Sequence, residues 1–440
     1  MKPAIFLVED IQDGQPITFY EKLFWKLKKK LESENKQLLW LSEVPKLLNS
    51  FGDNDIKFMS VYDFIEQPIS NSDYDVFYYI SCRHTLEMSG IQDFLAMDPD
   101  VLDYLETNKI PIILDTSCEV NDHYIAADCL FNGSEKINLR CHLDHHVFRG
   151  LKNIEFYIIG STQIPYGKKI VEGINIKYNF FPSGFFFYNW RGGPYYTSLV
   201  NQRDSVVERI KNKKITDDTF IWEAWGREPR LIRSIFQLKA EHEGLTSVGR
   251  YSRLRPAKDR YFKEMQRFDN LNEFGHLDFI SDELVDTLDQ VKILNNSIGW
   301  PTEDQNFVTD DSDVLFFVAL ETCQPIHHND IINSTANLTE KCTIRITSGQ
   351  PFIPLGGQHL GSILKDLGFK EYRMLEFPEI PHLLDEVNYV VDKIKQISKL
   401  TLEEKQALYE EWKETLIYNL DHYINLNIPR AFLESVRNAS

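Results

Sequence analysis

One segment of the chain places a charged pair where a helix is expected to begin. In "NLTEKCTIRITSGQPFIPLG" (337–356), Thr339 is a plausible N-cap, so Glu340 and Lys341 fall in the first helical turn. The helix dipole favours a glutamate there and disfavours a lysine. Lys341 therefore predicts a nearby anion, which could be a ligand phosphate or a neighbouring carboxylate. Glu340 could accept hydrogen bonds from ribose or sugar hydroxyls.

Three arginines mark a second predicted helix start. Arg227, Arg230 and Arg233 follow a predicted strand and open a helix in "GREPRLIRSIFQLKAEHEGL" (226–245). Free backbone N–H groups already attract anions at such a position, and arginine suits a diphosphate through paired contacts. Residues 203–268 hold 16 Lys/Arg and 10 Asp/Glu in a chain of net charge −18. The alternative interpretation is a solvated face of mixed ion pairs.

Carboxylates follow predicted strands in the first half of the chain. In "IILDTSCE" (112–119), Asp115 and Glu119 come directly after a buried strand and could act as a general base. Alternatively, Asp115 caps the next helix. In "VEDIQDGQPITFYEKL" (8–23), a strand ends at Glu9-Asp10, and a loop with Gly14 and Pro16 leads to a helix. This could be an acceptor-side loop with carboxylates at the strand end. An ordinary strand-to-helix turn is the alternative here.

The histidine cluster in "RCHLDHHVFRG" (140–150) does not predict a metal site. Its members, His142, Asp144, His145 and His146, lack the spacing of a helical histidine pair with a glutamate between. The sequence "DDSD" (310–313) precedes a strand and does not end one, so no metal-binding Asp-x-Asp motif is expected.

The elements that must position these residues alternate between strand and helix. Strands are expected at 4–9, 37–42, 76–82, 110–117, 154–161, 219–225, 313–321 and 351–357, and helices at 17–32, 231–245 and 337–349. Gly244 and Gly349 should end the last two helices. A helical tail follows from Pro381, with a capping box at Thr401 and Glu404 before a helix to about Tyr423. This alternation predicts an α/β fold with two Rossmann-like sheets.

The expected domains are an N-terminal lobe (1–190), a linker (191–217), a C-terminal lobe (218–380) and a helical tail (381–440) that packs back on the N-terminal lobe. The aromatic segment 180–200 reads as a hinge or as a loop packed on the core. Ligands of such sheets bind beyond the carboxyl ends of the strands, and a cleft between two lobes is the expected site.

Composition excludes several classes of protein. With 440 residues and 42% hydrophobic content, the chain can bury more than one core and is neither disordered nor fibrous. The acidic balance argues against a general nucleic-acid coat but not against a local basic groove. The six cysteines show no paired spacing, and the first apolar run is too short for a signal sequence, so we expect a cytoplasmic protein, in the host cytoplasm if viral. No stretch is long and apolar enough for a membrane span.

The segment "TEKCTIRITSGQPFIPLGGQHLGSILKDLGFKEY" (339–372) resembles the donor-side segment of two-lobed GT-B glycosyltransferases. Together with segment 226–245, it most resembles the glycosyltransferase-like proteins of tailed bacteriophages, a resemblance that implies a DNA-base glycosyltransferase as one expected activity. The resemblance implies two facing lobes and metal-independent transfer. It also implies that Arg227, Arg230, Arg233, Glu340 and Lys341 line a nucleotide-sugar site, with Asp115 or Glu119 facing the acceptor. Trp225-Gly226 and Leu231-Ile232 depart from the family pattern, so the sequence does not name the donor.

Three hypotheses follow. The first is transfer of a sugar from a nucleotide-diphosphate donor, UDP-linked in the expected case, to a hydroxyl, plausibly a hydroxymethyl pyrimidine in double-stranded phage DNA. The second moves the acceptor to a glycan, lipid or protein. The third is a non-catalytic virion or binding protein of the same fold. No permanently bound cofactor is expected.

Overall fold

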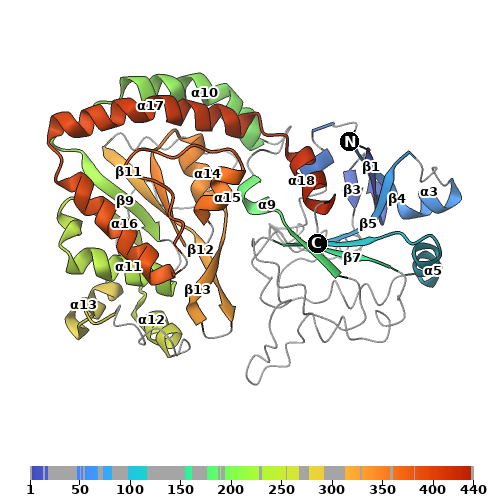
Figure 1. The fold of residues 1–440 in the computed structure, drawn as a ribbon, viewed down its shortest axis with the longest axis horizontal. Helices are drawn as coiled ribbons and strands as arrows, with labels where there is room; N and C mark the ends of the chain where they lie inside the picture. The colour runs from blue at the N-terminus through green and yellow to red at the C-terminus, as the bar shows by residue number, and fades with distance from the viewer. Residues whose placement is uncertain are drawn as a thin grey trace, which may run out of the picture. The chain divides into compact units, whose positions relative to one another are not determined.

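The chain forms two compact units. Unit 1 comprises Met1–Gly192 with Asn427–Ser440, and unit 2 comprises Gly193–Leu426 (Figure 1). The computed structural model describes residues 2–12, 15–17, 47–49, 51–52, 55–67, 73–81, 98–115, 154–160, 176–186, 189, 194–226, 230–253, 255–266, 277–291, 313–327, 330–356, 360–380 and 382–437.

Unit 1 is built on a parallel sheet in the order β4-β1-β5-β6-β7-β8. Its strands are β1 (Ala4–Val8), β4 (Ile56–Ser60), β5 (Asp75–Ser81), β6 (Ile112–Asp115), β7 (Phe156–Gly160) and β8 (Ile176–Phe180). Every residue of β1 is buried. A continuous apolar run of this kind is typical of a parallel strand covered on both faces.

Helices cover both faces of the unit 1 sheet. On one face, α3 (Val61–Glu66) packs near α5 (Pro99–Thr107), with Phe64 and Tyr104 in ring contact. On the other face, Phe432 of α18 (Ile428–Arg437) lies edge-on to Phe6, with ring centroids 5.6 Å apart. The short helix α9 (Ser183–Phe186) also belongs to this unit.

The segment after β1 differs from the predicted loop. Two short strands, β2 (Asp10–Gln12) and β3 (Gln15–Ile17), pair in antiparallel fashion, so Pro16 lies in a strand. Proline is tolerated there because a two-stranded ribbon leaves alternate N–H groups without a ladder partner. The predicted helix at 17–32 lies largely outside the described residues, as does the predicted strand at 37–42.

Unit 2 is built on a second parallel sheet in the order β10-β9-β11-β14. Its strands are β9 (Phe220–Gly226), β10 (Gly249–Arg253), β11 (Val314–Leu320) and β14 (Phe352–Leu355). All seven residues of β11 and all four of β14 are buried. The antiparallel hairpin of β12 (Thr322–His327) and β13 (Asp330–Asn337) follows β11.

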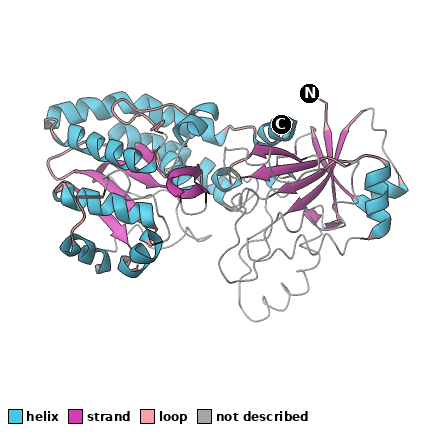
Figure 2. Ribbon diagram, turned by 60° about the horizontal axis from the view of Figure 1, so that its bottom comes forward, coloured by secondary structure: helices cyan, strands magenta, loops and turns pink. Residues whose placement is uncertain are grey.

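Helices also lie on both sides of the unit 2 sheet (Figure 2). On one side, α11 (Leu231–His242) places Phe236 edge-on to Trp222, with centroids 5.6 Å apart. On the other side, α14 (Glu340–Thr347) places Arg345 over Phe317. The remaining helices of the unit are α10 (Pro194–Asn212), α12 (Lys258–Met265), α13 (Asp282–Asp286), α15 (Leu360–Asp366), α16 (Leu383–Ser398) and α17 (Leu402–Ile424), with 3₁₀ turns η3 (Leu245–Ser247) and η4 (Thr287–Asp289).

The C-terminal helical region is present as predicted. The capping box forms, because Thr401 Oγ1 accepts from Glu404 N and Glu404 Oε2 accepts from Thr401 N. Helix α10 runs beside α17 (Figure 1), joined by the Arg203–Asp421 ion pair at 2.7 Å.

These features confirm the predicted fold class, an α/β protein with two doubly wound sheets and a helical C-terminal region. The predicted glycine ends are also confirmed, since Gly244 and Gly349 have φ values of +68° and +59°. The expected facing arrangement of two lobes and their domain limits stay predictions.

Candidate functional site

Each sheet has a point where its strand order reverses. In unit 2 the chain passes from β9 outward to β10 and then returns to the other side of β9 to form β11. The reversal therefore lies between the carboxyl ends of β9 and β11. In unit 1 it lies between those of β1 and β5. Open α/β sheets bind their ligands beyond the strand ends at such points.

In unit 2, a buried glutamate stands beside this point. Glu321 directly follows β11 and has no exposed surface. Its Oε1 accepts hydrogen bonds from the backbone N–H groups of Thr339 and Cys342, each at 3.1 Å. Its Oε2 accepts from Thr339 Oγ1 at 2.5 Å. Thr339 is the N-cap residue of α14, as predicted, but the acceptor that caps the helix comes from Glu321.

The same contacts bear on the two interpretations of Lys341. Its Nζ donates to Thr339 Oγ1 at 3.0 Å, and that hydroxyl in turn donates to Glu321. A neighbouring carboxylate is thus present at the start of α14, as one of the two alternatives expects. Glu340 is the first residue of α14, and its side chain lies outside what the structure describes.

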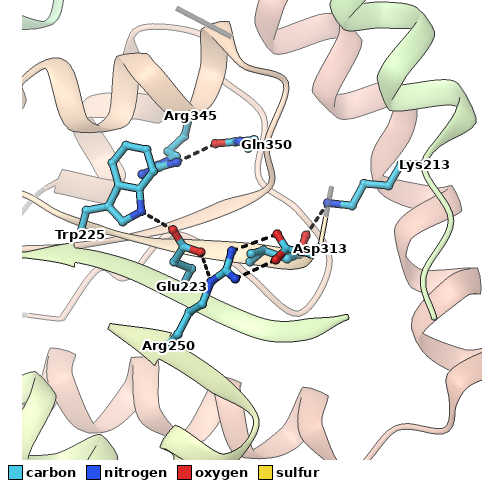
Figure 3. A network of polar contacts seen from close by, with 8 residues as sticks. Lys213, Glu223, Trp225, Arg250, Asp313, Arg345 and Gln350 are labelled. Carbon is cyan, nitrogen blue, oxygen red and sulfur yellow. Dashed lines mark hydrogen bonds and ion pairs between the residues drawn. The ribbon is translucent and has the colours of Figure 1, made fainter. Parts of the chain in front are cut away.

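A stacked arginine joins α14 to the end of β9 (Figure 3). The guanidinium of Arg345 lies over the Trp225 ring, and its Nη1 donates to Gln350 Oε1 at 2.7 Å. Trp225 Nε1 donates to Glu223, which is buried in β9. Because Trp225 is followed by Gly226 and the arginine segment, this contact ties together the two segments predicted to bind the donor.

Continuing the network, Arg250 donates from Nε to Glu223 Oε2 at 2.5 Å and from both Nη atoms to Asp313 at 2.7 and 2.9 Å (Figure 3). Burial lowers the pKa of Arg250, but its hydrogen bonds to Asp313 and Glu223 outweigh that effect and raise it overall. Asp313 belongs to the "DDSD" segment (310–313), and it forms an ion pair with Arg250 at the amino end of β11.

The predicted arginines occupy different environments. Arg227 lies outside the described residues, Arg230 is exposed at the N-cap of α11, and Arg233 is buried in the first turn. The first N–H of α11, that of Leu231, donates to Glu264 Oε2 at 2.5 Å. Both helix starts predicted to bind an anion therefore already receive a glutamate from another element.

Arg233 places a buried positive charge in the first turn of α11. Burial raises the pKa of Tyr251 to about 12, against the opposing charges of Arg233 and Arg253. Arg253 is buried as well, and it donates to Gln237 Oε1 at 2.7 Å and to the Thr287 carbonyl at 2.8 Å. Positive charge therefore gathers near the carboxyl ends of β9 and β10.

In unit 1, the predicted acceptor-side residues are only partly covered. Asp115 is the last residue of β6, as predicted, but its side chain is not described, and Glu119 lies outside the described residues. Glu9 follows β1 and is buried. It accepts from Tyr62 at 3.1 Å and from Tyr78 at 3.5 Å. Burial, reinforced by the charge of Glu9, raises the pKa of Tyr62 to about 12.

Much of the basic stretch is engaged within unit 2. Its internal partners include carboxylates and backbone carbonyls: Arg203 with Asp421, Arg209 with the Ser348 carbonyl, Lys239 with Glu243, Arg250 with Glu223 and Asp313, Lys258 with Asp286, and Arg260 with Glu264. These contacts favour the alternative interpretation, a face of mixed ion pairs.

The sequence patterns did not single out several buried charged residues. Among them are Glu223, Glu321, Arg345 and Glu386, the last of which accepts from Gly356 N at 3.2 Å. A charged residue that ends a wholly apolar run, as Glu321 does in "VLFFVALE", is the signal that could have pointed to it.

Within the described ranges, no group of His, Cys, Asp and Glu is arranged to hold a metal ion. The histidine cluster at 142–146 lies outside those ranges. None of the described helices is long and apolar enough to cross a membrane.

No protein family model matches the sequence, and no curated protein matches it. Several solved structures align along the chain at low similarity. Anabaena Alr3699/HepE in complex with UDP and glucose has a TM-score of 0.37 and 12% identity, covering 99% of this chain and 100% of that one. A UDP-forming trehalose-phosphate synthase from Burkholderia xenovorans has a TM-score of 0.37 and 8% identity, covering 99% of each chain. Phytolacca americana UGT2, complexed with UDP-2-fluoro-glucose and pterostilbene, has a TM-score of 0.26 and 10% identity, again covering 99% of each. These scores are too low to support a conclusion about this chain, so its fold assignment rests on the two parallel sheets.

Proposed function

We propose that the chain is a glycosyltransferase that moves a sugar from a nucleotide-diphosphate sugar to a hydroxyl. One observation carries the proposal: the strand-order reversal of unit 2 is flanked by the starts of α11 and α14, where Arg230, Arg233 and Lys341 lie. The carboxyl edge of a doubly wound sheet is where nucleotides bind. Cations of three side chains at one such edge suit a diphosphate.

The proposed transfer needs cations that stabilise the leaving diphosphate and a base that takes the proton of the acceptor hydroxyl. Negative charge develops on the leaving diphosphate, and Lys341 with the arginines would stabilise it. Glu340 would hold ribose or sugar hydroxyls. A carboxylate at the carboxyl edge of the unit 1 sheet, Asp115 or Glu119, would take the proton from the acceptor hydroxyl. No step in this scheme uses a metal ion, and we propose a UDP-linked donor on the sequence resemblance of residues 339–372.

Two classes of acceptor are candidates for the transfer. The bacteriophage resemblance supports a hydroxymethyl pyrimidine in DNA. The internal ion pairs of the basic stretch, together with the net charge of −18, support instead a glycan, lipid or protein acceptor. A protein that binds duplex DNA through phosphates loses affinity steeply as salt rises, which separates the two.

Calorimetric titration with nucleotide sugars tests the donor half. We expect the full chain to bind at least one of UDP-glucose, UDP-galactose, UDP-N-acetylglucosamine, GDP-mannose or dTDP-glucose. The Lys341→Ala variant should bind at least about tenfold more weakly, the scale of one hydrogen bond to a charged group. Lys214→Ala is the matched control, because Lys214 is exposed on the segment before β9, at the opposite edge of the sheet. Absence of binding to every nucleotide sugar would refute the proposal.

Nucleoside mass analysis tests the acceptor half. DNA containing hydroxymethyl pyrimidines is incubated with the protein and the bound donor, then digested to nucleosides. A hexose-shifted nucleoside identifies DNA as the acceptor. An unshifted digest, together with no detectable binding of duplex DNA even at low salt, selects the glycan, lipid or protein alternative.

A further inference from the structure

The hydroxyl of Thr339 connects a buried carboxylate to a lysine. A threonine hydroxyl has a single proton to donate. Here that proton goes to Glu321 Oε2, at 2.5 Å. The oxygen lone pairs are thereby turned toward Lys341, whose Nζ donates to the same oxygen at 3.0 Å.

Glu321 is itself held firmly. Its backbone N–H donates to the Leu355 carbonyl at 2.8 Å, which ties it to the end of β14. Its carboxylate accepts from two backbone N–H groups at the start of α14, at 3.1 Å each. The side chain has no exposed surface, and a carboxylate in that setting is stable only when its oxygens receive such donors.

We propose that Glu321 and Thr339 are positioning residues that set the place of the Lys341 ammonium and, through it, the affinity of unit 2 for a diphosphate. The inference rests on the proposed function, in which Lys341 contacts the donor diphosphate. The relay runs from Glu321, which fixes the direction of the Thr339 hydroxyl, to the hydroxyl oxygen, which holds the lysine. Glu321 also offsets the positive charge that would otherwise disfavour a lysine in the first turn of α14.

Capping and positioning can be separated by mutation. Capping of α14 by Glu321 uses the backbone N–H groups of Thr339 and Cys342, which valine or serine at 339 leaves in place. Positioning of Lys341 uses the hydroxyl. Thr339→Val keeps the volume and the capping bonds but removes the hydroxyl, whereas Thr339→Ser keeps the hydroxyl.

The test is calorimetric titration of the full chain with UDP, GDP, CDP, ADP and dTDP. Against the nucleotide that binds, Thr339→Val should weaken affinity about fivefold to tenfold, and Thr339→Ser should stay within about twofold of wild type. In the Lys341→Ala background, Thr339→Val should have no further effect, because the two residues act through one contact. Glu321→Gln should lower both affinity and stability, since its amide NH₂ would face donors.

A variant at Lys341 tests the same relay without any change at residue 339. Lys341→Arg retains the charge on a half-buried side chain but replaces the compact ammonium by a planar fork. If the position of the ammonium determines affinity, Lys341→Arg should lose nearly as much affinity for the nucleotide as Lys341→Ala.

The possible results discriminate between the two proposals. The relay is overturned if the wild-type chain binds a nucleotide and Thr339→Val binds it equally well. It is also overturned if Thr339→Val weakens affinity as much in the Lys341→Ala background as in the wild type. Either result leaves the glycosyltransferase proposal standing. Full affinity in Lys341→Arg also overturns the relay. No binding of any nucleoside diphosphate or nucleotide sugar by the wild-type chain overturns both.

Discussion

The guanidinium carbon of Arg345 lies 3.9 Å from the centroid of the Trp225 ring. It lies 3.8 Å from the centroid of Phe317 on the neighbouring strand. An arginine stacked in this way buries its planar face on aromatic surface while its edge donates hydrogen bonds, here to Gln350. One residue of α14 thus fixes the helix that begins with Glu340 and Lys341 against the strand that leads into the arginine segment.

The two carboxylates that bind Arg250 should differ sharply in their contribution to stability. Glu223 is 1% exposed and Asp313 is 48% exposed at the side chain. Glu223→Gln should lower the free energy of unfolding by roughly 3 kcal/mol, because it breaks a buried ion pair. Asp313→Asn should cost no more than about 1 kcal/mol, as expected for an exposed pair. Urea denaturation measures both, and equal losses would contradict the buried placement of Glu223.

Two glycines with positive φ provide a second matched pair. A Cβ at Gly349 would lie 2.5 Å from Ile210 Cδ1, whereas one at Gly244 would meet nothing within 4 Å. Gly244→Ala should cost about 1 kcal/mol, the cost of left-handed backbone alone. Gly349→Ala should cost at least about 1 kcal/mol more, because of crowding against α10. Thermal unfolding of the two variants would disprove the packing of α14 on α10 if it showed the same loss for both.

The exposed and buried arginines of α11 should respond differently to alanine. Arg230→Ala should weaken nucleotide-sugar binding about tenfold while the free energy of unfolding changes by no more than about 0.5 kcal/mol. Arg233→Ala should lower stability measurably as well, because Arg233 is only 4% exposed and its removal leaves a gap in the core. Calorimetry for affinity and denaturation for stability give the two values. A stability loss in Arg230→Ala equal to that in Arg233→Ala would be the contrary result.

Alkaline pH should destabilise the fold in part through Tyr251. Its pKa is raised by burial to about 12 in the folded chain, against about 10 when unfolded. A raised folded pKa gives stability that is complete below pH ~10 and is lost as pH rises toward ~12. Between these values Tyr251→Phe should reduce the slope of unfolding free energy against pH by about 1.4 kcal/mol per unit. Denaturation at several pH values checks the slope, and an unchanged slope would speak against the buried phenol.

Hydrophobic patterns and helix-capping residues in the sequence predicted much of the fold. The apolar runs at 4–9 and 313–321 became buried parallel strands, and the Thr401–Glu404 pair formed its capping box. Such features depend on neighbours in the sequence, so a single sequence can reveal them. The position of Thr339 before the helical pattern likewise predicts its place as the N-cap of α14.

The partners of the candidate site could not be predicted in the same way. Glu321 reaches Thr339 only because the β12–β13 hairpin between them folds back on itself, and no local pattern encodes that return. Glu264 caps α11 from a helix further along the chain. The basic stretch looked like a surface for anions because its carboxylate partners, such as Asp421 and Asp286, lie far away in the sequence.

The packing of α18 has a consequence for the order in which the protein folds during synthesis. Phe432 fills the face of the unit 1 sheet formed by Phe6 and Tyr79. Phe432 emerges from the ribosome long after β1, so the first sheet to be made stays without one of its covering helices until unit 2 has been translated. Domains usually complete in the order of their synthesis. Here the unit that starts first is completed last, because Asn427–Ser440 belongs to unit 1 and follows the whole of unit 2 in the chain.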